Sequence, residues 1–168
     1  MEPVEINAGS YYLRQLRADD RIDDRPALLA AFADPAMQRA LPGHAVRTTE
    51  DATGYIDACA AGWRDDRSYA WGVAEPTTGA LIGEVLLDLG SAETAELTAW
   101  THPDARRGGV ATTAVGTVVR FGFGALGLTR VDATCGAGDV AAAALAERCG
   151  FSRDGDDDPD TLRWTRRG

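Results

Sequence analysis

Arg106-Arg107-Gly108-Gly109-Val110-Ala111-Thr112-Thr113 decides the fold, because of what stands on either side of it. Before it, residues 95–102 read Ala-Glu-Leu-Thr-Ala-Trp-Thr-His, a pattern typical of a strand. After it, apolar side chains recur with the period of a helix, at Val110, Ala114, Val118 and Phe121. Glycines where a helix begins leave backbone N–H groups uncovered at the positive end of the helix dipole. With two arginines adjacent, the turn is predicted to hold an anion, and a diphosphate is the anion we expect.

The spacing Arg106-x-x-Gly109-x-Ala111 resembles the Arg/Gln-x-x-Gly-x-Gly/Ala signature with which GNAT acetyltransferases hold the pyrophosphate of acetyl-coenzyme A. Glu147-Arg-Cys-Gly-Phe151 resembles the Glu-Lys-Leu-Gly-Phe ending of the last long helix in the ribosomal-protein-alanine (Rim-type) N-acetyltransferase branch. Residues 95–112 resemble that branch's block of strand, His-Pro, Arg and glycines, and residues 10–17 with Asp34-Pro35 resemble its opening. The resemblance covers roughly the whole chain.

For the fold, this resemblance implies a mixed α/β (α+β) architecture: a central, mostly antiparallel sheet of about seven strands flanked by about four helices. In the family, strands four and five splay apart, and the pantetheine arm of the coenzyme hydrogen-bonds to the fourth strand in the gap. Carried over, this strand is Ala95 to His102, with contacts near Thr101 and His102. The remaining coenzyme contacts are expected at Arg106, Arg107, Gly108, Gly109, Val110, Ala111, Thr112 and Asp139.

Patterns in the residues predict a matching order of elements. Strands are expected over 10–17, 69–75, 80–89, 94–102, 130–135 and 161–165. Four helices are expected: one capped by Asp19 or Asp20, one from the capping box Thr48-x-x-Asp51, one after Gly109, and one from Asp139 to Gly150. No composition break or repeat divides the chain, so residues 1–168 are expected to form a single domain.

Composition narrows the function classes. The net charge of −9 argues against a nucleic-acid partner. All seventeen basic residues are arginine. The chain shows neither a signal-peptide pattern nor an apolar run near 18 residues, so no membrane span is expected. The three cysteines have no paired spacing, which favours small buried thiols in a reducing cytoplasm. The two histidines have no partner at a ligand spacing, which argues against a metal site. We therefore expect a cytoplasmic protein.

Moving an acetyl group from a thioester to an amine requires a base, and three carboxylates on adjacent strands are candidates. If Leu89 pairs with Ala95, Asp88 faces Glu96 and Glu84 faces Trp100 on one face of the sheet. Such a face is either solvated or a functional cleft. Glu96 is the first choice, because the resembling family often has Glu on this strand, and Glu84 is the second.

The sequence departs from the family at its usual acid residues. Counting back from Phe151, the family's Asn falls on Asp139, its Ser on Ala142 and its Tyr on Ala146. The resemblance implies an acetyl-CoA-dependent N-acetyltransferase without a metal. In such an enzyme a primary amine, of a protein N-terminus or of a small molecule, attacks the thioester of acetyl-CoA directly with the help of a general base. A homodimer is a further expectation. The alternatives are a non-catalytic acyl-CoA-binding module of the same fold, and an interaction domain without coenzyme.

Overall fold

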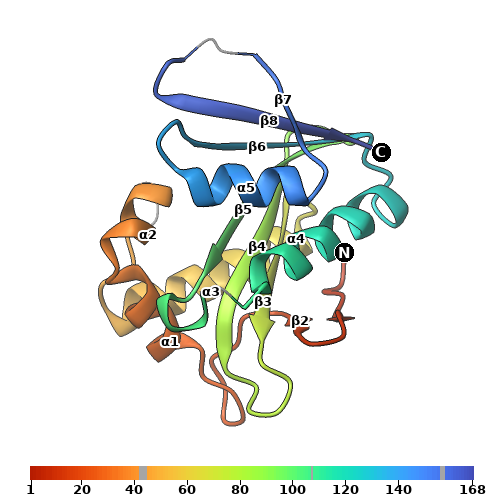
Figure 1. Cartoon of the computed structure of the whole chain (residues 1–168). Helices are drawn as coiled ribbons and strands as arrows, with labels where there is room; N and C mark the ends of the chain where they lie inside the picture. The colour runs from red at the N-terminus through yellow and green to blue at the C-terminus, as the bar shows by residue number, and fades with distance from the viewer. Residues whose placement is uncertain (42–44, 107, 156–157) are drawn as a thin grey trace.

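The computed structural model describes residues 1–41, 45–106, 108–155 and 158–168. Within these ranges, Ala40 is described by its backbone alone. Figure 1 shows the arrangement of its elements. In chain order they are β1 (Ile6–Asn7), β2 (Tyr12–Arg14), α1 (Arg25–Phe32), α2 (Pro35–Ala40), α3 (Thr49–Arg64), β3 (Ser68–Ala74), β4 (Leu81–Leu89), β5 (Thr94–Thr101), the 3-10 helix η1 (Pro103–Ala105), α4 (Val110–Gly124), β6 (Arg130–Gly136), α5 (Val140–Arg148), β7 (Ser152–Arg153) and β8 (Thr161–Arg167).

The eight described strands form one open sheet in the order β1-β2-β3-β4-β5-β6-β8-β7. Neighbouring strands run antiparallel except β5 and β6, which are parallel. The mixed, mostly antiparallel α/β fold expected from the sequence is confirmed. The eight described strands exceed the seven or so that the resemblance implied. Residue patterns predicted six of them and missed β1 and β7, which have two residues each, too few for alternation to reveal.

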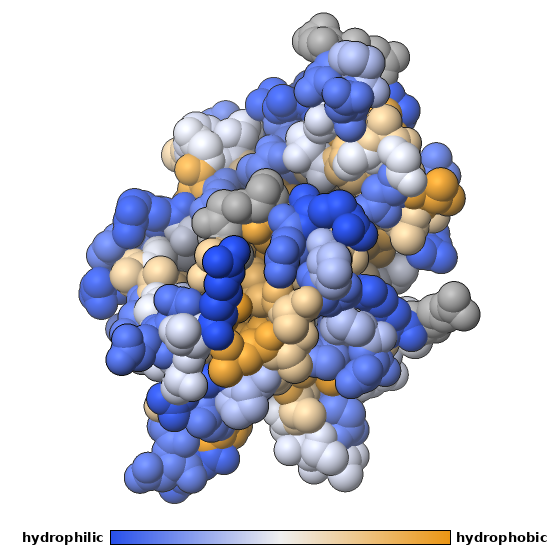
Figure 2. Space-filling view, turned by 90° about the vertical axis from the view of Figure 1, so that its left-hand side faces the viewer, coloured by the Kyte–Doolittle hydropathy of each residue, from blue (hydrophilic) through white to orange (hydrophobic). Residues whose placement is uncertain are grey.

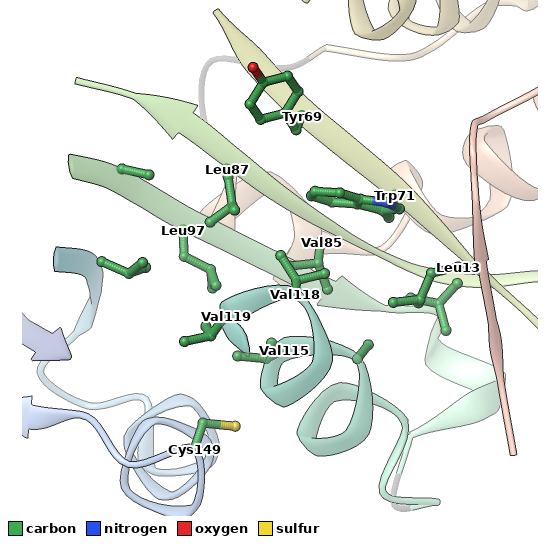
Figure 3. Close-up of a cluster of buried hydrophobic side chains, with 14 of the residues drawn as sticks. Leu13, Tyr69, Trp71, Val85, Leu87, Leu97, Val115, Val118, Val119 and Cys149 are labelled. Atoms are coloured by element: carbon green, nitrogen blue, oxygen red, sulfur yellow. The ribbon is translucent and has the colours of Figure 1, made fainter. Parts of the chain in front are cut away.

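Helices cover both faces of the sheet (Figure 1). On one face, α4 packs against β4 and β5, and α5 packs beside α4. Figure 3 shows side chains of β3 to β5, including Trp71, Val85 and Leu87, pointing toward Val115 and Val118 of α4. On the other face, α1, α2 and α3 enclose a second cluster that includes Phe32 and Trp100. Burying each large apolar side chain contributes about 1.5–3 kcal/mol, so the two clusters fix the helices on the sheet.

The β4–β5 hairpin has the predicted register. Leu89 pairs with Ala95, Asp88 with Glu96, and Glu84 with Trp100. From Gly83 to Leu89 and along β5, odd-numbered residues face α4 and even-numbered ones face α1 to α3, because side chains alternate along a strand. An irregularity in the β3–β4 pairing places Leu81 on the α1-to-α3 face instead. The three candidate carboxylates therefore share the face that α1 to α3 partly cover.

Three helix starts are confirmed and one is wrong. Thr48 and Asp51 form the capping box of α3, Asp139 caps α5, and Gly109 precedes α4. The first helix, however, begins at Arg25 rather than after Asp19 or Asp20. The Asp19 carboxylate instead accepts hydrogen bonds from the backbone N–H groups of residues 21 and 22, which closes a turn. Among the described residues, no helix combines the length and the apolar character needed to span a bilayer.

Candidate functional site

A cleft of about 460 Å³ lies where the C-terminal end of β5 meets the start of α4. Its walls come from α2, the end of β5, the turn before α4, and α5; they include Met37, Trp100, Gly109, Ala142 and Leu145. Figure 2 views the face on which α2 lies and shows apolar surface gathered in a hollow bordered by hydrophilic residues. An elongated ligand with a polar end and an apolar arm suits such a lining.

The sheet is split beside this cleft. Strands β5 and β6 pair only at Thr94–Arg130, Ala95–Val131 and Glu96–Asp132, and beyond the last of these pairs their ladder stops. Residues 97–101 of β5 thus border a gap. This is the splay that the resemblance implied, between the fourth and fifth strands counted without the two-residue β1.

Backbone alternation decides which groups of β5 face the gap. The His102 N–H donates to Ile82 O at 2.8 Å. The backbone groups of the other even-numbered residues of β5, such as Trp100, therefore also form hydrogen bonds with β4. The N–H and C=O groups of Ala99 and Thr101 then point toward the gap, and both residues line the cleft. The expected contact at Thr101 is available. His102 is not, because its C=O also accepts from Ala105 N at 2.9 Å.

The turn before α4 has the geometry of an anion site. Gly109 adopts a φ of +74° at the N-cap, a left-handed conformation that favours glycine. Because glycine has no side chain to cap the helix, the first N–H groups of α4, from Val110 to Thr112, have no side-chain acceptor. Gly108 and Gly109 are exposed, whereas Val110 is buried under the turn. Uncapped amides at the positive end of a fifteen-residue helix attract a phosphate.

Charges around the turn differ from what the sequence alone indicated. Arg106 lines the cleft and pairs with Asp34 at 2.7 Å, so part of its charge is neutralised. Arg107, the second expected arginine, lies outside the described residues. Asp139 lines the cleft while its carboxylate accepts from Ala142 N at 3.0 Å, as the cap of α5. Its carboxylate is therefore held at the start of α5, on the wall of the cleft.

Glu96 lies at the apex of the gap, at the last β5–β6 pair. It is half-buried, and it lines a second hollow of about 300 Å³ on the face of the sheet that carries the even-numbered residues. Burial raises the pKa of Glu96; the charge of Arg163 acts against this rise, and the carboxylates of Asp132 and Asp88 add to it. A half-buried carboxyl with a raised pKa is suited to accept a proton near neutral pH.

Glu84 is more deeply placed, at 2% exposure, and lines neither hollow. Its Oε1 accepts a hydrogen bond from the Tyr55 hydroxyl at 2.7 Å, while its Oε2 has no hydrogen-bond partner among the described residues. Burial raises the pKa of Glu84 to about 7, although the donors Tyr55 and Trp100 lower it in part. The indole N–H of Trp100 lies close enough to lower the pKa of Glu84, but it makes no hydrogen bond to the carboxylate within the geometric limits.

The sequence missed two parts of the site. Helix α2 supplies Ala36 and Met37 to the cleft, and its only sequence signal is the Asp34-Pro35 start. Asp132 lies beside Glu96 and was not singled out, because nothing local links residues 36 positions apart. Within the described ranges, no group of three or more His, Cys, Asp or Glu side chains is arranged to hold a metal ion.

Comparison with known protein families finds a family model that matches most of this chain. The model described as acetyltransferase (GNAT) domain matches residues 12–152. The uncharacterized N-acetyltransferase YoaA of Bacillus subtilis (strain 168) is 28% identical over 134 residues, which are 79% of this chain and 76% of YoaA.

Two solved structures with coenzyme A bound have the same fold. Mycobacterium smegmatis RimJ in complex with CoA-disulfide aligns with a TM-score of 0.82 at 19% identity, covering 99% of this chain and 88% of its own. Spermidine N-acetyltransferase from Vibrio cholerae, in complex with CoA and spermine, aligns with a TM-score of 0.79 at 17% identity, covering 94% and 95%. At these identities the likeness establishes the fold alone.

Proposed function

Because the chain belongs to the GNAT acetyltransferase family and is thus an acetyl-CoA-dependent acyltransferase, we propose that it acetylates a primary amine by direct attack on the thioester. The observation that carries this proposal is the cleft that joins the uncapped amides of α4 to the gap-facing backbone of Ala99 and Thr101. An extended thioester carrier would lie along it with its diphosphate at the helix, and its acyl end would point along β5 toward the apex of the gap, where Glu96 lines the second hollow.

The diphosphate would bind the N–H groups from Gly108 to Thr112, with charge supplied by Arg106 and Arg107. The pantetheine arm would add to β5 like a strand, using the free backbone groups of Ala99 and Thr101. Contacts at His102 are weaker candidates, since both of its backbone groups already have partners. Asp139 would border the coenzyme as a helix cap and would disfavour the phosphates by its charge.

Glu96 is the proposed base, acting directly or through one water. It borders the gap and an open hollow, so an amine can reach it, whereas Glu84 is 2% exposed and lines neither hollow. Glu84 remains the second candidate because its pKa of about 7 suits proton transfer at neutral pH. Ala142 lies in the cleft without a hydroxyl, so water would protonate the leaving thiolate.

The acceptor would be a protein N-terminus or a small amine. The net charge of −9 favours a cationic molecule. The second hollow agrees in sign, since three carboxylates outnumber its two arginines, Arg130 and Arg163. The three cysteines Cys59, Cys135 and Cys149 are free thiols, which supports a cytoplasmic setting. Residues 1–168 would act as a single domain.

A specific observation favours a second candidate, a non-catalytic acyl-CoA-binding module: alanines occupy the positions of both expected hydroxyl residues. Calorimetry with acetyl-CoA, followed by thiol release with a panel of amines and N-terminal peptides, separates the two. The enzyme requires both binding and turnover, whereas binding without turnover across the panel identifies the module.

Base assignment needs matched variants. Glu96→Gln should lower kcat by at least about 100-fold while the Kd for acetyl-CoA stays within about twofold. Glu93→Gln, an exposed carboxylate in the preceding turn, serves as the control. An unchanged kcat in Glu96→Gln together with a lost kcat in Glu84→Gln would reassign the base to Glu84.

A further inference from the structure

A row of polar side chains crosses the sheet at the apex of the gap. Register places Asp88 of β4, Glu96 of β5, Asp132 of β6 and Thr165 of β8 next to one another on one face. Glu96 thus has a carboxylate neighbour on each side. The two neighbours differ, because Asp88 is exposed whereas Asp132 is 5% exposed.

Asp132 is held from several directions. Its Oδ2 accepts a hydrogen bond from Arg163 Nη2 at 3.2 Å and lies 3.0 Å from Arg130 Nε, and its Oδ1 accepts from the Thr165 hydroxyl. These partners come from β6 and β8, so the network ties both strands to the point where β5 separates from them. These partners hold the buried carboxylate of Asp132 in one position.

We propose that Asp132 is a positioning residue of the reaction: fixed by Arg163, Arg130 and Thr165, it holds a carboxylate beside Glu96 at the apex of the gap. This inference rests on the proposed role of Glu96 as base. A neighbouring negative charge makes Glu96 a stronger proton acceptor. Arg163 acts in the opposite direction, which limits the effect.

The charged and titratable groups around Glu96 come from each element that packs against it. They are Asp88 from β4, Arg130 and Asp132 from β6, and Arg163 from β8, with the Thr134 hydroxyl as a nearby donor. On the helix side, Cys59 of α3 lies near Asp88, and burial raises the pKa of its thiol, which stays neutral. Asp132 and Arg163 are therefore the fixed charges whose removal has opposite effects.

The test is the acid limb of the pH–kcat/KM profile. Asp132→Asn should move this limb to lower pH by about one unit, since it removes a negative neighbour and frees two arginine charges. Arg163→Gln should move it to higher pH by about half a unit, since it removes a positive charge. Arg167→Gln, an exposed arginine four residues along the same strand face, should leave the limb unchanged.

Glu96→Gln separates this inference from the proposed function. If its acid limb disappears while the limbs of Asp132→Asn and Arg163→Gln coincide with the wild type, Glu96 remains the base and the role of Asp132 is overturned. A limb that persists in Glu96→Gln overturns both. A purely structural Asp132 would lower kcat without moving the limb. If Asp132→Asn does not fold, Arg163→Gln decides alone, because half of that side chain is exposed.

Discussion

Gly109 and Gly127 share a left-handed backbone, with φ of +74° and +70°, but only Gly109 borders the cleft. A Cβ built on either would meet no atom within 4 Å. We predict that Gly109→Ala and Gly127→Ala each lose about 1 kcal/mol of stability from backbone strain. Only Gly109→Ala should also weaken acetyl-CoA binding, by at least about tenfold, because its methyl group would occupy the path of the diphosphate.

Calorimetry of acetyl-CoA binding and urea unfolding of both variants check this pair. Equal losses of affinity in Gly109→Ala and Gly127→Ala would indicate a general loosening of the fold. Retained affinity in both would place the diphosphate away from this turn.

Glu84 makes the stability of the protein depend on pH. Its pKa is about 7 in the folded protein and near 4.5 when unfolded, so folding favours the protonated form. The stability that this carboxyl contributes is present below pH 4.5 and is lost as the pH rises through 7. Glu84→Gln stays neutral and can still accept from Tyr55, so we predict equal stability at pH 4 and a gain of about 3 kcal/mol above pH 7.

Urea unfolding of the wild type and of Glu84→Gln at several pH values gives that difference directly. A difference that does not change between pH 4 and pH 8 would contradict a raised pKa at Glu84. The measurement is independent of catalysis, because Glu84 is tested here only as a buried group.

Residue identity predicted the glycine turn before α4 but not the charged groups that surround it. Two glycines between a strand and a helix are a local signal, and the structure places Gly109 at the left-handed N-cap. The Arg106–Asp34 pair joins residues 72 positions apart, and Asp132 meets Glu96 only through strand pairing. These contacts depend on tertiary packing, so no local pattern could reveal them.

At the level of elements, the turn chemistry made prediction possible. The β4–β5 register followed from a short turn between alternating strands, and the caps of α3 and α5 followed from single side chains. The start of α1 could not be predicted from a single side chain in this way. Asp24 stands at its N-cap, but its carboxylate binds the buried guanidinium of Arg14 at 2.8 and 2.9 Å instead of the helix. A distant buried cation thus outcompeted the local cap.

The cap of α5 allows an element-level prediction, since Asp139 both caps the helix and lines the cleft. Asp139→Asn keeps an acceptor for Ala142 N and removes a negative charge near the diphosphate. We expect unchanged stability and a roughly threefold to tenfold tighter Kd for coenzyme A. Asp139→Ala should lose about 1 kcal/mol of stability with the cap.

Asp57→Asn on α3 controls for the change in net charge, because Asp57 is exposed and does not line the cleft. Calorimetry at low and high salt checks the effect, which should shrink as salt screens it. An equal gain in Asp57→Asn would assign the effect to net charge rather than to position.

Across the whole molecule, the two halves of the sheet are joined by a short ladder where the proposed chemistry takes place. Strands β1 to β5 and strands β6 to β8 are connected in the sheet by three parallel pairs, from Thr94–Arg130 to Glu96–Asp132. Beyond them, α4 and α5 meet across the gap, where the Cys149 thiol donates to Thr112 O at 3.8 Å. A ligand in the cleft would touch β5, α4 and α5 together, and would therefore bind the two parts of the sheet to each other.

Coenzyme binding should accordingly stabilise the whole chain. At a free concentration 100 times its Kd, acetyl-CoA would add about 2.7 kcal/mol, which for a chain of this length raises Tm by about 5–10 °C. Differential scanning calorimetry with and without acetyl-CoA measures the shift, and Gly109→Ala at the same concentrations should show a smaller one. Because the ligand bridges both parts, the transition should move as a single peak. A scan that splits into two transitions, with only one shifted, would show that the coenzyme contacts one side of the gap alone.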